Sequence, residues 1–376
     1  MENAAADQWV GERMVQTGRN YAVQRQRLIT KQPDLKLVKI TQGFYLNVAD
    51  LPPGLPHWEL RRIVSFPRMF AVREQAGARQ RPVVFTGECA AVASGVSTVW
   101  SVPNIAFRVE GKRKHKRELP PVAIAGCIVP KAYAYHVTGG MRMNEKECSR
   151  TPSGLVLAPP PVLIADECRR YHPMKRFTAG SALLTRLTGF VWRNPGPSRQ
   201  AARGVKRAWL RRAEEIKDGR AYRVYHAVIR GLDVGIQSPV EAMALYAVKC
   251  HLPERKYDRV QTQFHVLTSV GSFYLDIAFP EMLEGLEADG RIKYGKDAKA
   301  IDAYAASHVR RHQALVNEGW AISHVTSEQL GQPSMLATIG KAMQDIRVLP
   351  PGRPPAPRGA LYKPLSADLF HRARRF

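Results

Sequence analysis

The sequence predicts a multidomain protein of mixed class, with α+β and α/β parts, on three observations. At about 100–200 residues per domain, a chain of 376 residues corresponds to two or three domains. Hydrophobic residues make up 45% and charged residues 24%, which are globular values and argue against wholesale disorder. The segment 235–346 alternates helical and strand-like runs in the order α-β-β-β-α-β-α, which predicts an α/β domain with a central sheet.

The first 50 residues are predicted to be winged-helix-like. Residues 8–32 contain few Gly or Pro residues and end at Pro33-Asp34, which predicts a helical segment. Residues 35–46 alternate as a strand does, with a turn at Gln42-Gly43. A helix followed by a short hairpin is the order in which a winged helix ends, and a plain α+β start is the alternative.

Residues 51–190 are predicted to form an α+β domain, and residues 191–234 a basic helical connector. A Pro-rich loop at 48–59 precedes a small-residue helix within 83–100, for which Thr86 is the candidate N-cap. Further elements are strands between 103 and 140 and helices over 162–171, 178–190 and 203–217. The Pro- and Arg-rich tail, 347–376, is predicted to be extended or disordered.

Residues 235–346 have the clearest boundaries. Ser238 is a candidate N-cap, Pro239 fits the first turn and Glu241 completes a capping-box spacing, which predicts a helix over 237–250. Gly319 is placed to end a long helix as its C′ residue. The later elements are predicted at 261–267, 271–280 and 282–289 (strands), 297–318 (helix), 321–325 (strand) and 333–346 (helix).

The net charge of +25 is unevenly distributed and predicts an anionic partner. Residues 235–345 hold 11 Lys+Arg and 13 Asp+Glu, a net −2, whereas the rest holds 46 and 19, a net +27. Two segments concentrate the excess: 107–120 has six basic and two acidic residues, and 191–230 has eleven and three. Nucleic acid, with DNA favoured, is the expected partner. Solvated basic surfaces, or a basic protein of a ribonucleoprotein, are the alternatives.

Candidate phosphate contacts come from these basic segments and from one later helix. They are Lys112, Arg113, Lys114, Lys116 and Arg117 in the first segment, Arg203, Lys206, Arg207, Arg211 and Arg212 in the second, and Arg310 and Arg311 in the predicted helix 297–318. His308 and His312 flank the last pair and share a helix face. A phosphate-facing or solvated histidine pair is preferred over a metal pair, since no HExxH pattern is present.

The cysteines and the hydropathy pattern indicate a cytoplasmic protein. The five cysteines are scattered and include no CxxC pair, which argues against a disulfide framework and a cysteine zinc site. The sequence contains no apolar run of about 18–20 residues and no signal-peptide pattern at its start, so no membrane association is expected.

A group of acidic residues predicts a metal site in the least basic part of the chain. Asp276 lies in the middle of one predicted strand, and Glu287 and Asp289 lie two residues apart on the next, which puts them on one face. Glu241 is close enough in the predicted topology to assist. Clustered carboxylates favour a divalent cation with oxygen ligands, for which we expect Mg²⁺, and Lys293 would stabilise charge. A solvated sheet face is the alternative interpretation.

The segment from Ser238 to about Met343 resembles the PD-(D/E)XK nuclease superfamily, in its branch related to very-short-patch-repair endonucleases. The matching blocks are SPVE (238–241), LDIAFPE (275–281), EADGRIK (287–293) and HVRRHQALVNEGWAISHVT (308–326). The resemblance implies a restriction-endonuclease-like domain over 235–346 with a mixed central sheet, and a catalytic group of Asp276, Glu287, Asp289, Lys293 and Glu241. The usual E-x-K pattern is absent, because Glu287-Ala-Asp289 is followed by a lysine only at 293.

The upstream part resembles abortive-infection type IV antitoxin and regulator proteins of actinobacteria, in ITQGFY (40–45) and FTGECAAVASGV (85–96). This resemblance implies an antitoxin-like region over 51–190, and a cognate toxin or a second copy of the chain as partner. Two functions follow as expectations. The first is a DNA-binding protein whose Mg²⁺-dependent nuclease-like domain hydrolyses phosphodiester bonds. The second is a non-catalytic DNA-binding transcriptional regulator or antitoxin.

Overall fold

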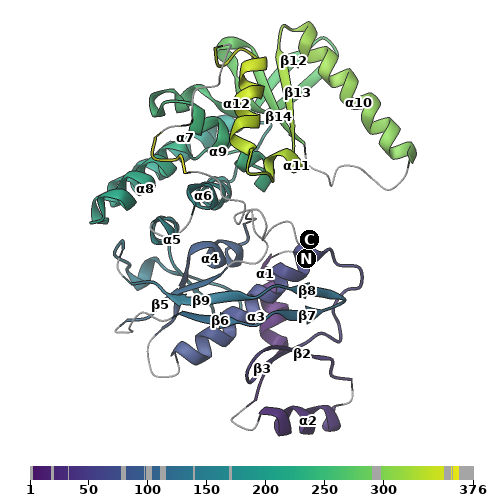
Figure 1. The fold of residues 1–376 in the computed structure, drawn as a ribbon, viewed down its shortest axis with the longest axis vertical. Helices are drawn as coiled ribbons and strands as arrows, with labels where there is room; N and C mark the ends of the chain where they lie inside the picture. The colour runs from purple at the N-terminus through teal and green to yellow at the C-terminus, as the bar shows by residue number, and fades with distance from the viewer. Residues whose placement is uncertain are drawn as a thin grey trace. The chain divides into compact units, whose positions relative to one another are not determined.

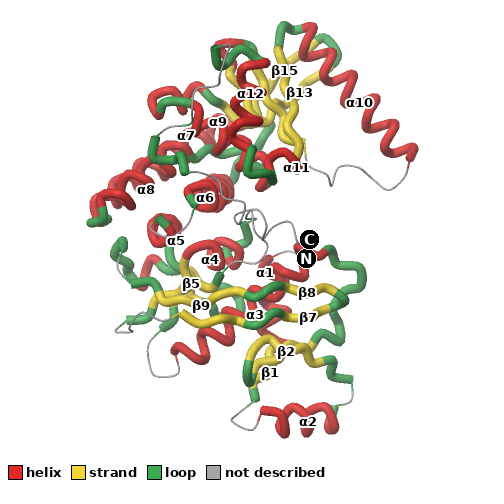
Figure 2. Tube along the Cα trace, in the orientation of Figure 1, coloured by secondary structure: helices red, strands yellow, loops and turns green. Residues whose placement is uncertain are grey.

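The computed structural model describes residues 3–17, 21–32, 34–77, 82–96, 98, 104–110, 116–138, 140–168, 172–289, 298–350, 357 and 359–363. The chain is a mixed α/β protein with several sheets, in agreement with the fold class predicted (Figures 1 and 2). It divides into two compact units, residues 1–169 with 215–217 and residues 170–214 with 218–376. Among the described residues, none of the helices has the length and apolar character needed to cross a membrane.

Unit 1 begins with a three-stranded sheet and two helices. Its elements are α1 (Asn3–Arg13), β1 (Met14–Gln16), α2 (Tyr21–Lys31), β2 (Leu37–Thr41) and β3 (Phe44–Asn47). The sheet order is β1-β3-β2 and both pairings are antiparallel. The predicted hairpin is therefore present, but the helical segment expected over 8–32 is interrupted by a strand. That strand forms because the backbone of 14–16 pairs with β3, which local helix propensity does not register.

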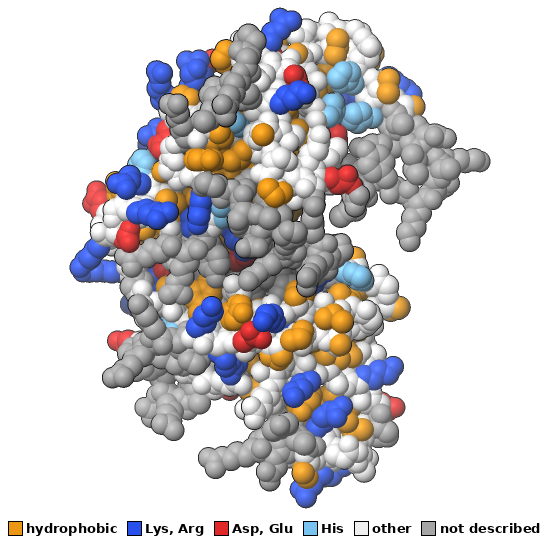
Figure 3. Space-filling view, viewed as in Figure 1, with side chains coloured by type: hydrophobic (Ala, Val, Ile, Leu, Met, Phe, Trp, Pro, Cys, Tyr) orange, Lys and Arg blue, Asp and Glu red, His pale blue; other side chains and the backbone are white. Residues whose placement is uncertain are grey.

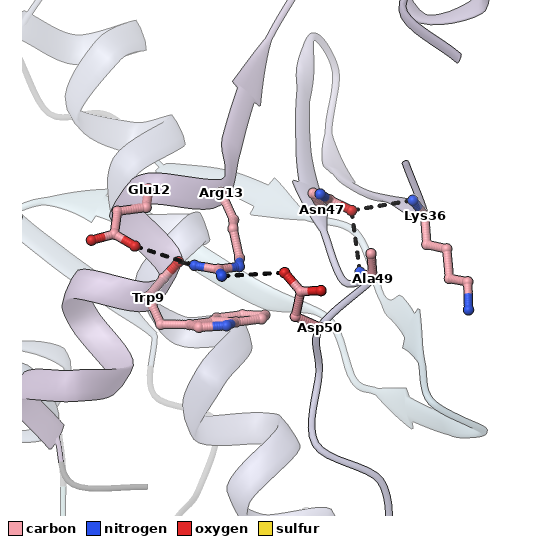
Figure 4. Close-up of polar contacts among 7 residues, drawn as sticks. All are labelled: Trp9, Glu12, Arg13, Lys36, Asn47, Ala49 and Asp50. Atoms are coloured by element: carbon pink, nitrogen blue, oxygen red, sulfur yellow. Dashed lines mark hydrogen bonds and ion pairs between the residues drawn. The ribbon is translucent and has the colours of Figure 1, made fainter. Parts of the chain in front are cut away.

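Polar contacts hold α1 against the chain that follows β3 (Figure 4). The Arg13 guanidinium lies over the Trp9 ring, 4.9 Å from its centroid, and forms ion pairs at 3.3 Å with Glu12 and Asp50. Asn47 Oδ1 accepts hydrogen bonds from the backbone N–H groups of Lys36 and Ala49, which fixes the start and the end of the hairpin.

The rest of unit 1 is built around a six-stranded mixed sheet of order β10-β11-β4-β5-β9-β6, beside a hairpin of β7 and β8. The elements are α3 (His57–Gly77), β4 (Val84–Thr86), α4 (Gly87–Ala93), β5 (Ile105–Arg108), β6 (Lys116–Leu119), β7 (Val122–Ile124), β8 (Cys127–Val129), β9 (Ala132–His136), η1 (Glu145–Glu147), β10 (Ser149–Arg150), β11 (Val156–Leu157) and α5 (Pro160–Glu167).

A buried polar network ties this sheet to α5. The Arg108 Nε donates to Asp166 Oδ2 at 2.7 Å, and Thr86 Oγ1 donates to the same oxygen at 2.8 Å. Thr86 stands at the N-cap of α4, as predicted, but its side chain bonds Asp166 instead of capping the helix. The small-residue helix is also shorter than the predicted segment, because residues 84–86 pair with β5 and β11.

Unit 2 starts with four helices and continues into a four-stranded sheet. Its elements are α6 (Pro173–Thr188), α7 (Pro195–Arg211), η2 (Arg212–Glu215), α8 (Gly219–Gly231), α9 (Pro239–His251), η3 (Glu254–Arg259), β12 (Gln261–Thr268), β13 (Gly271–Phe279), η4 (Pro280–Met282), β14 (Glu284–Asp289), α10 (Ala298–Asn317), β15 (Ala321–Thr326), α11 (Ser327–Leu330) and α12 (Met335–Asp345). From α9 onward, the order predicted from the sequence is present, with boundaries within a few residues.

The sheet of unit 2 is mixed, in the order β12-β13-β14-β15. The first two pairings are antiparallel and β14 pairs with β15 in parallel, since α10 carries the chain back to the same edge. A core cluster of Val266, Leu275, Ala278, Leu315 and Trp320 packs the end of α10 against the strands. Gly319 ends this packing helix with φ +84°, as its predicted C′ role requires.

Part of the tail predicted to be extended or disordered packs against unit 2. Leu361 is fully buried, and its carbonyl oxygen accepts a 2.6 Å hydrogen bond from the Tyr246 hydroxyl. The Nε2 of His172 lies 2.9 Å from the Lys363 carbonyl oxygen. The composition of the tail did not predict this contact, because the segment is anchored by a single leucine among prolines and arginines.

Candidate functional site

The predicted carboxylates meet where β13 and β14 separate. The ladder between these strands pairs Ile277–Phe279 with Glu284–Leu286 and stops there. Asp276 is the next residue along β13, and its side chain takes the place of the missing backbone pairing. Its Oδ2 accepts a 2.9 Å hydrogen bond from the Ala288 N–H. The opened strands therefore hold the Asp276 carboxylate directly beside Glu287.

A residue of the neighbouring strand with an unusual backbone conformation supplies a second partner for Asp276. Gln263 has φ +46° and stands between the pairs Thr262–Ile277 and Phe264–Leu275 of the β12–β13 ladder, whose register is the same on both sides of it. Here the Gln263 amide Nε2 donates to Asp276 Oδ1 at 3.1 Å, so each oxygen of Asp276 accepts one hydrogen bond.

Glu287 is the most perturbed acid of this group. Its side chain is 6% exposed, and Oε1 accepts from Arg311 Nη2 at 2.6 Å. Burial raises the pKa of Glu287 well above its usual range, and the neighbouring Asp276 carboxylate raises it further. The Arg311 guanidinium opposes this rise, and the same Nη2 also donates to the Tyr274 carbonyl oxygen at 2.5 Å. A positive charge at this position is therefore already part of the fold.

Asp289 has further partners of its own, and its charge also contributes to the raised pKa of Glu287. Its Oδ2 lies 3.1 Å from Nδ1 of His324 on β15. The His308 ring on α10 is 4.8 Å from the His324 ring, and the His312 ring is 5.6 Å from it (centroid distances). Figure 3 shows histidine side chains gathered on unit 2 beside α10. Burial lowers the pKa of His308 and of His312, so both rings favour the neutral form at pH 7.

The remaining predicted acid–base residues have different surroundings. Glu241 lies in the first turn of α9 and is part of the cap of that helix. Its Oε1 accepts from the Ser238 hydroxyl at 2.8 Å, its Oε2 accepts from the Gln237 N–H at 3.0 Å, and its own N–H donates to Ser238. The capping interaction predicted from the sequence is thus present, and it gives Glu241 a structural role. Lys293 lies outside the described residues.

The predicted phosphate contacts fall into an exposed group and a group with internal partners. Arg203, Arg207 and Arg211 are exposed on α7 at intervals of four residues, so they form one stripe. Lys206, on the same helix, instead donates from Nζ to the Arg230 and Leu232 carbonyl oxygens at the end of α8, 2.8 Å each. Arg212 follows α7 in η2 and is half-buried.

On α10 the two predicted arginines differ in the same way, since Arg310 is exposed and Arg311 pairs with Glu287. In unit 1, Lys112, Arg113 and Lys114 lie outside the described residues. Lys116 and Arg117 are strand residues of β6, and the Lys116 ammonium stands over the Tyr133 ring at 4.4 Å.

Two residues at this site were not singled out from the sequence. His324 was predicted only as part of a strand, and Gln263 only as part of another. The parallel pairing of residues 284–289 with 321–326 places His324 opposite Glu287. The order of the strands, which a local sequence pattern does not show, therefore brings His324 to the site. The position of Gln263 depends on a positive φ at a non-glycine residue, which the sequence does not indicate.

Comparison of the chain with protein-family models, with curated proteins and with solved structures gives no match. The chemistry of the site therefore rests on its geometry. Two carboxylates lie side by side where two strands of the sheet separate. One of them, Glu287, has a raised pKa and an arginine partner. A third acid stands among histidines at the edge of the same strand. Carboxylate clusters of this kind can bind a cation or hold a proton.

Proposed function

We propose that unit 2 is a nuclease-like domain that hydrolyses phosphodiester bonds of DNA with the help of a divalent cation. The observation that carries this proposal is the juxtaposition of Asp276 and Glu287 where β13 and β14 separate. Keeping two carboxylates so close in a partly buried place is unfavourable unless positive charge compensates them. Arg311 pairs with only one oxygen of Glu287, so acceptor capacity for a cation is left.

The donor set fits Mg²⁺, because Asp276, Glu287 and Asp289 offer the hard oxygen ligands that this ion prefers. When bound, Mg²⁺ would polarise the phosphodiester and increase the acidity of a water molecule. The protein's own residues would position the group: the Gln263 amide and the Ala288 N–H orient Asp276, and Arg311 orients Glu287.

The basic surface of the same unit supports DNA as the substrate. Arg203, Arg207 and Arg211 form an exposed stripe on α7, and Arg220 and Arg223 are exposed on α8. Guanidinium groups bind phosphate oxygens well, and repeated contacts of this kind produce affinity that falls steeply with salt. In unit 1, the three-stranded sheet β1-β3-β2 with its two helices supports the winged-helix-like interpretation and a second DNA-binding part.

The test is cleavage of plasmid and linear duplex DNA by the purified full-length chain, with MgCl₂ or with EDTA. Asp276→Ala removes the central carboxylate, and Asp276→Asn preserves its shape and part of its hydrogen bonding. Glu281→Ala is the matched control, because Glu281 is an exposed acid of the same unit in a surface ion pair with Arg259. We expect cleavage by the parent and by Glu281→Ala only. Equal cleavage by the Asp276 variants, or none by the parent, would overturn the proposal.

A second function, a non-catalytic DNA-binding regulator or antitoxin, is favoured by one observation. Each carboxylate of the site already has protein partners: Asp276 has Gln263 and the Ala288 N–H, Glu287 has Arg311, and Asp289 has His324. Such a network can stabilise a domain without chemistry. This function predicts DNA binding in EDTA that is unchanged in Asp276→Ala and is sequence-selective in a footprinting assay.

A further inference from the structure

Three side chains from separate elements converge beside the carboxylate pair. Asp289 ends β14, His308 lies on α10 and His324 lies on β15, yet one ligand atom of each is within 4.8 Å of the other two. All three are half-buried. They are therefore held in place by the fold and still reachable from solvent. They share one edge because α10 connects the parallel strands β14 and β15.

The spacing is close to that of a metal-binding group. Ligand atoms at about 2.0–2.2 Å from a tetrahedral zinc ion lie about 3.3–3.6 Å from one another. Asp289 Oδ2 and His324 Nδ1, at 3.1 Å, are already near this separation. His308 needs to approach by about 1 Å, which rotation of a half-buried ring on a helix surface can provide.

The donor chemistry distinguishes this group from the site of the proposed function. Mg²⁺ and Ca²⁺ prefer oxygen ligands, whereas two imidazoles with one carboxylate suit transition-metal dications. Three protein ligands also leave a fourth position for water, as in open zinc sites. The two histidines, and not the carboxylate, favour a transition-metal dication over Mg²⁺ or Ca²⁺ at this group.

We propose that Asp289, His308 and His324 form a binding site for a transition-metal dication of the Zn²⁺ class. This inference goes beyond the proposed function, because the site can bind its ion whether or not unit 2 hydrolyses DNA. Asp289 belongs to both sites. A bound transition metal at Asp289 would therefore stand next to the carboxyl group of Glu287, two residues earlier on the same strand.

The alternative is a hydrogen-bonded Asp289–His324 pair with two further histidines stacked nearby and no bound ion. The two arrangements differ in one residue. His312 lies on α10 one turn after His308, and its ring is also near His324, but it is not a member of the converging group. A metal site requires His308 and not His312, whereas loose binding by surface imidazoles would involve both equally.

The experiment uses the full-length chain, stripped with a chelator and titrated with ZnCl₂ by calorimetry and with CoCl₂ by visible absorption. We expect one equivalent of Zn²⁺ to bind in the presence of excess Mg²⁺, with Co²⁺ giving the d–d bands of a low-coordinate site. His308→Ala and His324→Ala should each weaken binding at least about 10-fold, and His312→Ala should leave it unchanged. Circular dichroism would show that all three variants fold alike.

Several outcomes would overturn the proposal: no saturable Zn²⁺ binding, equal losses in the His308 and His312 variants, or competition by Mg²⁺ at equal concentration. The Asp276→Ala variant separates this site from the proposed function. We expect it to bind Zn²⁺ as the parent does and to lose cleavage. Lost zinc binding in this variant would contradict the zinc site alone, and retained cleavage would contradict the proposed function alone.

Discussion

Replacing Arg311 with leucine should destabilise unit 2 and make its stability strongly dependent on pH. Arg311 is the cationic partner of Glu287, whose side chain is 6% exposed, and it also donates to the Tyr274 carbonyl oxygen. Removing one partner of a buried ion pair costs about 3–5 kcal/mol, because the other charge is left desolvated and alone. Arg311 itself keeps 30% of its side chain exposed, so we expect the smaller value of about 2–3 kcal/mol near neutral pH.

The pH dependence follows from the raised pKa of Glu287. Between the ordinary carboxyl pKa and this raised value, the folded state binds more protons than the unfolded state, so stability falls as pH rises. Arg311 lowers the pKa of Glu287, and its removal extends this window upward. The loss caused by Arg311→Leu should therefore be smaller at pH 5, where Glu287 can take up a proton, than at pH 8.

The assay is urea unfolding at pH 5 and pH 8, monitored by hydrogen exchange of peptides that cover β13 and β14. The double variant Arg311→Leu with Glu287→Gln completes a mutant cycle. Compared with Arg311→Leu alone, the double variant should regain part of the lost stability, because a neutral amide needs no cationic partner. Its free energy of unfolding should also differ little between pH 5 and pH 8. The same loss at both pH values, or an equal effect of Arg311→Leu in the Glu287→Gln background, would refute the coupling between these residues.

Three further predictions concern residues outside the carboxylate group. Burial lowers the pKa of His172 to about 4, so its contribution to stability should fall by about 2–3 kcal/mol as pH drops from about 6.5 to 4, and His172→Asn should remove this dependence in urea titrations. Lys206→Met should destabilise unit 2 by about 1.5–3 kcal/mol, because two charge-assisted hydrogen bonds are lost. Arg207→Met should change stability by less than about 0.5 kcal/mol, and it should weaken DNA binding in a salt titration. Gly285→Ala would place a Cβ 2.8 Å from Ile322 Cδ1 and should cost about 1–3 kcal/mol by denaturant unfolding, with an unchanged midpoint contradicting the tight packing of β14.

Much of unit 2 could be predicted from the sequence, because its local signals agree with its tertiary contacts. The capping residues Ser238 and Glu241 mark the start of α9, and Gly319 marks the end of α10. The strands between them are bounded by turns. Where the local pattern and the packing point the same way, element order and boundaries follow.

The prediction was incomplete where pairing partners lie far away in the sequence. The strand at 14–16 forms because β3 is available to it, and Leu361 is buried because unit 2 offers it a place. Within the site, Asp276 and Glu287 were predicted on consecutive strands, but the positions of Gln263 and His324 depend on a positive φ and on strand order. The role of Lys206 depends on the end of a neighbouring helix. None of these properties is encoded in a local pattern.

The most direct test of the central claim is the single-turnover rate at which the full-length chain cleaves a labelled DNA duplex. The rate should be measured with Mg²⁺ and with EDTA, for the parent and for Glu287→Gln. The account predicts that the parent cleaves the duplex only when the cation is present. It predicts that Glu287→Gln, whose fold the neutral amide preserves, cleaves at least about 100-fold more slowly. Cation-dependent cleavage at the parent rate by Glu287→Gln would contradict it, as would a parent chain that binds the duplex and leaves it intact.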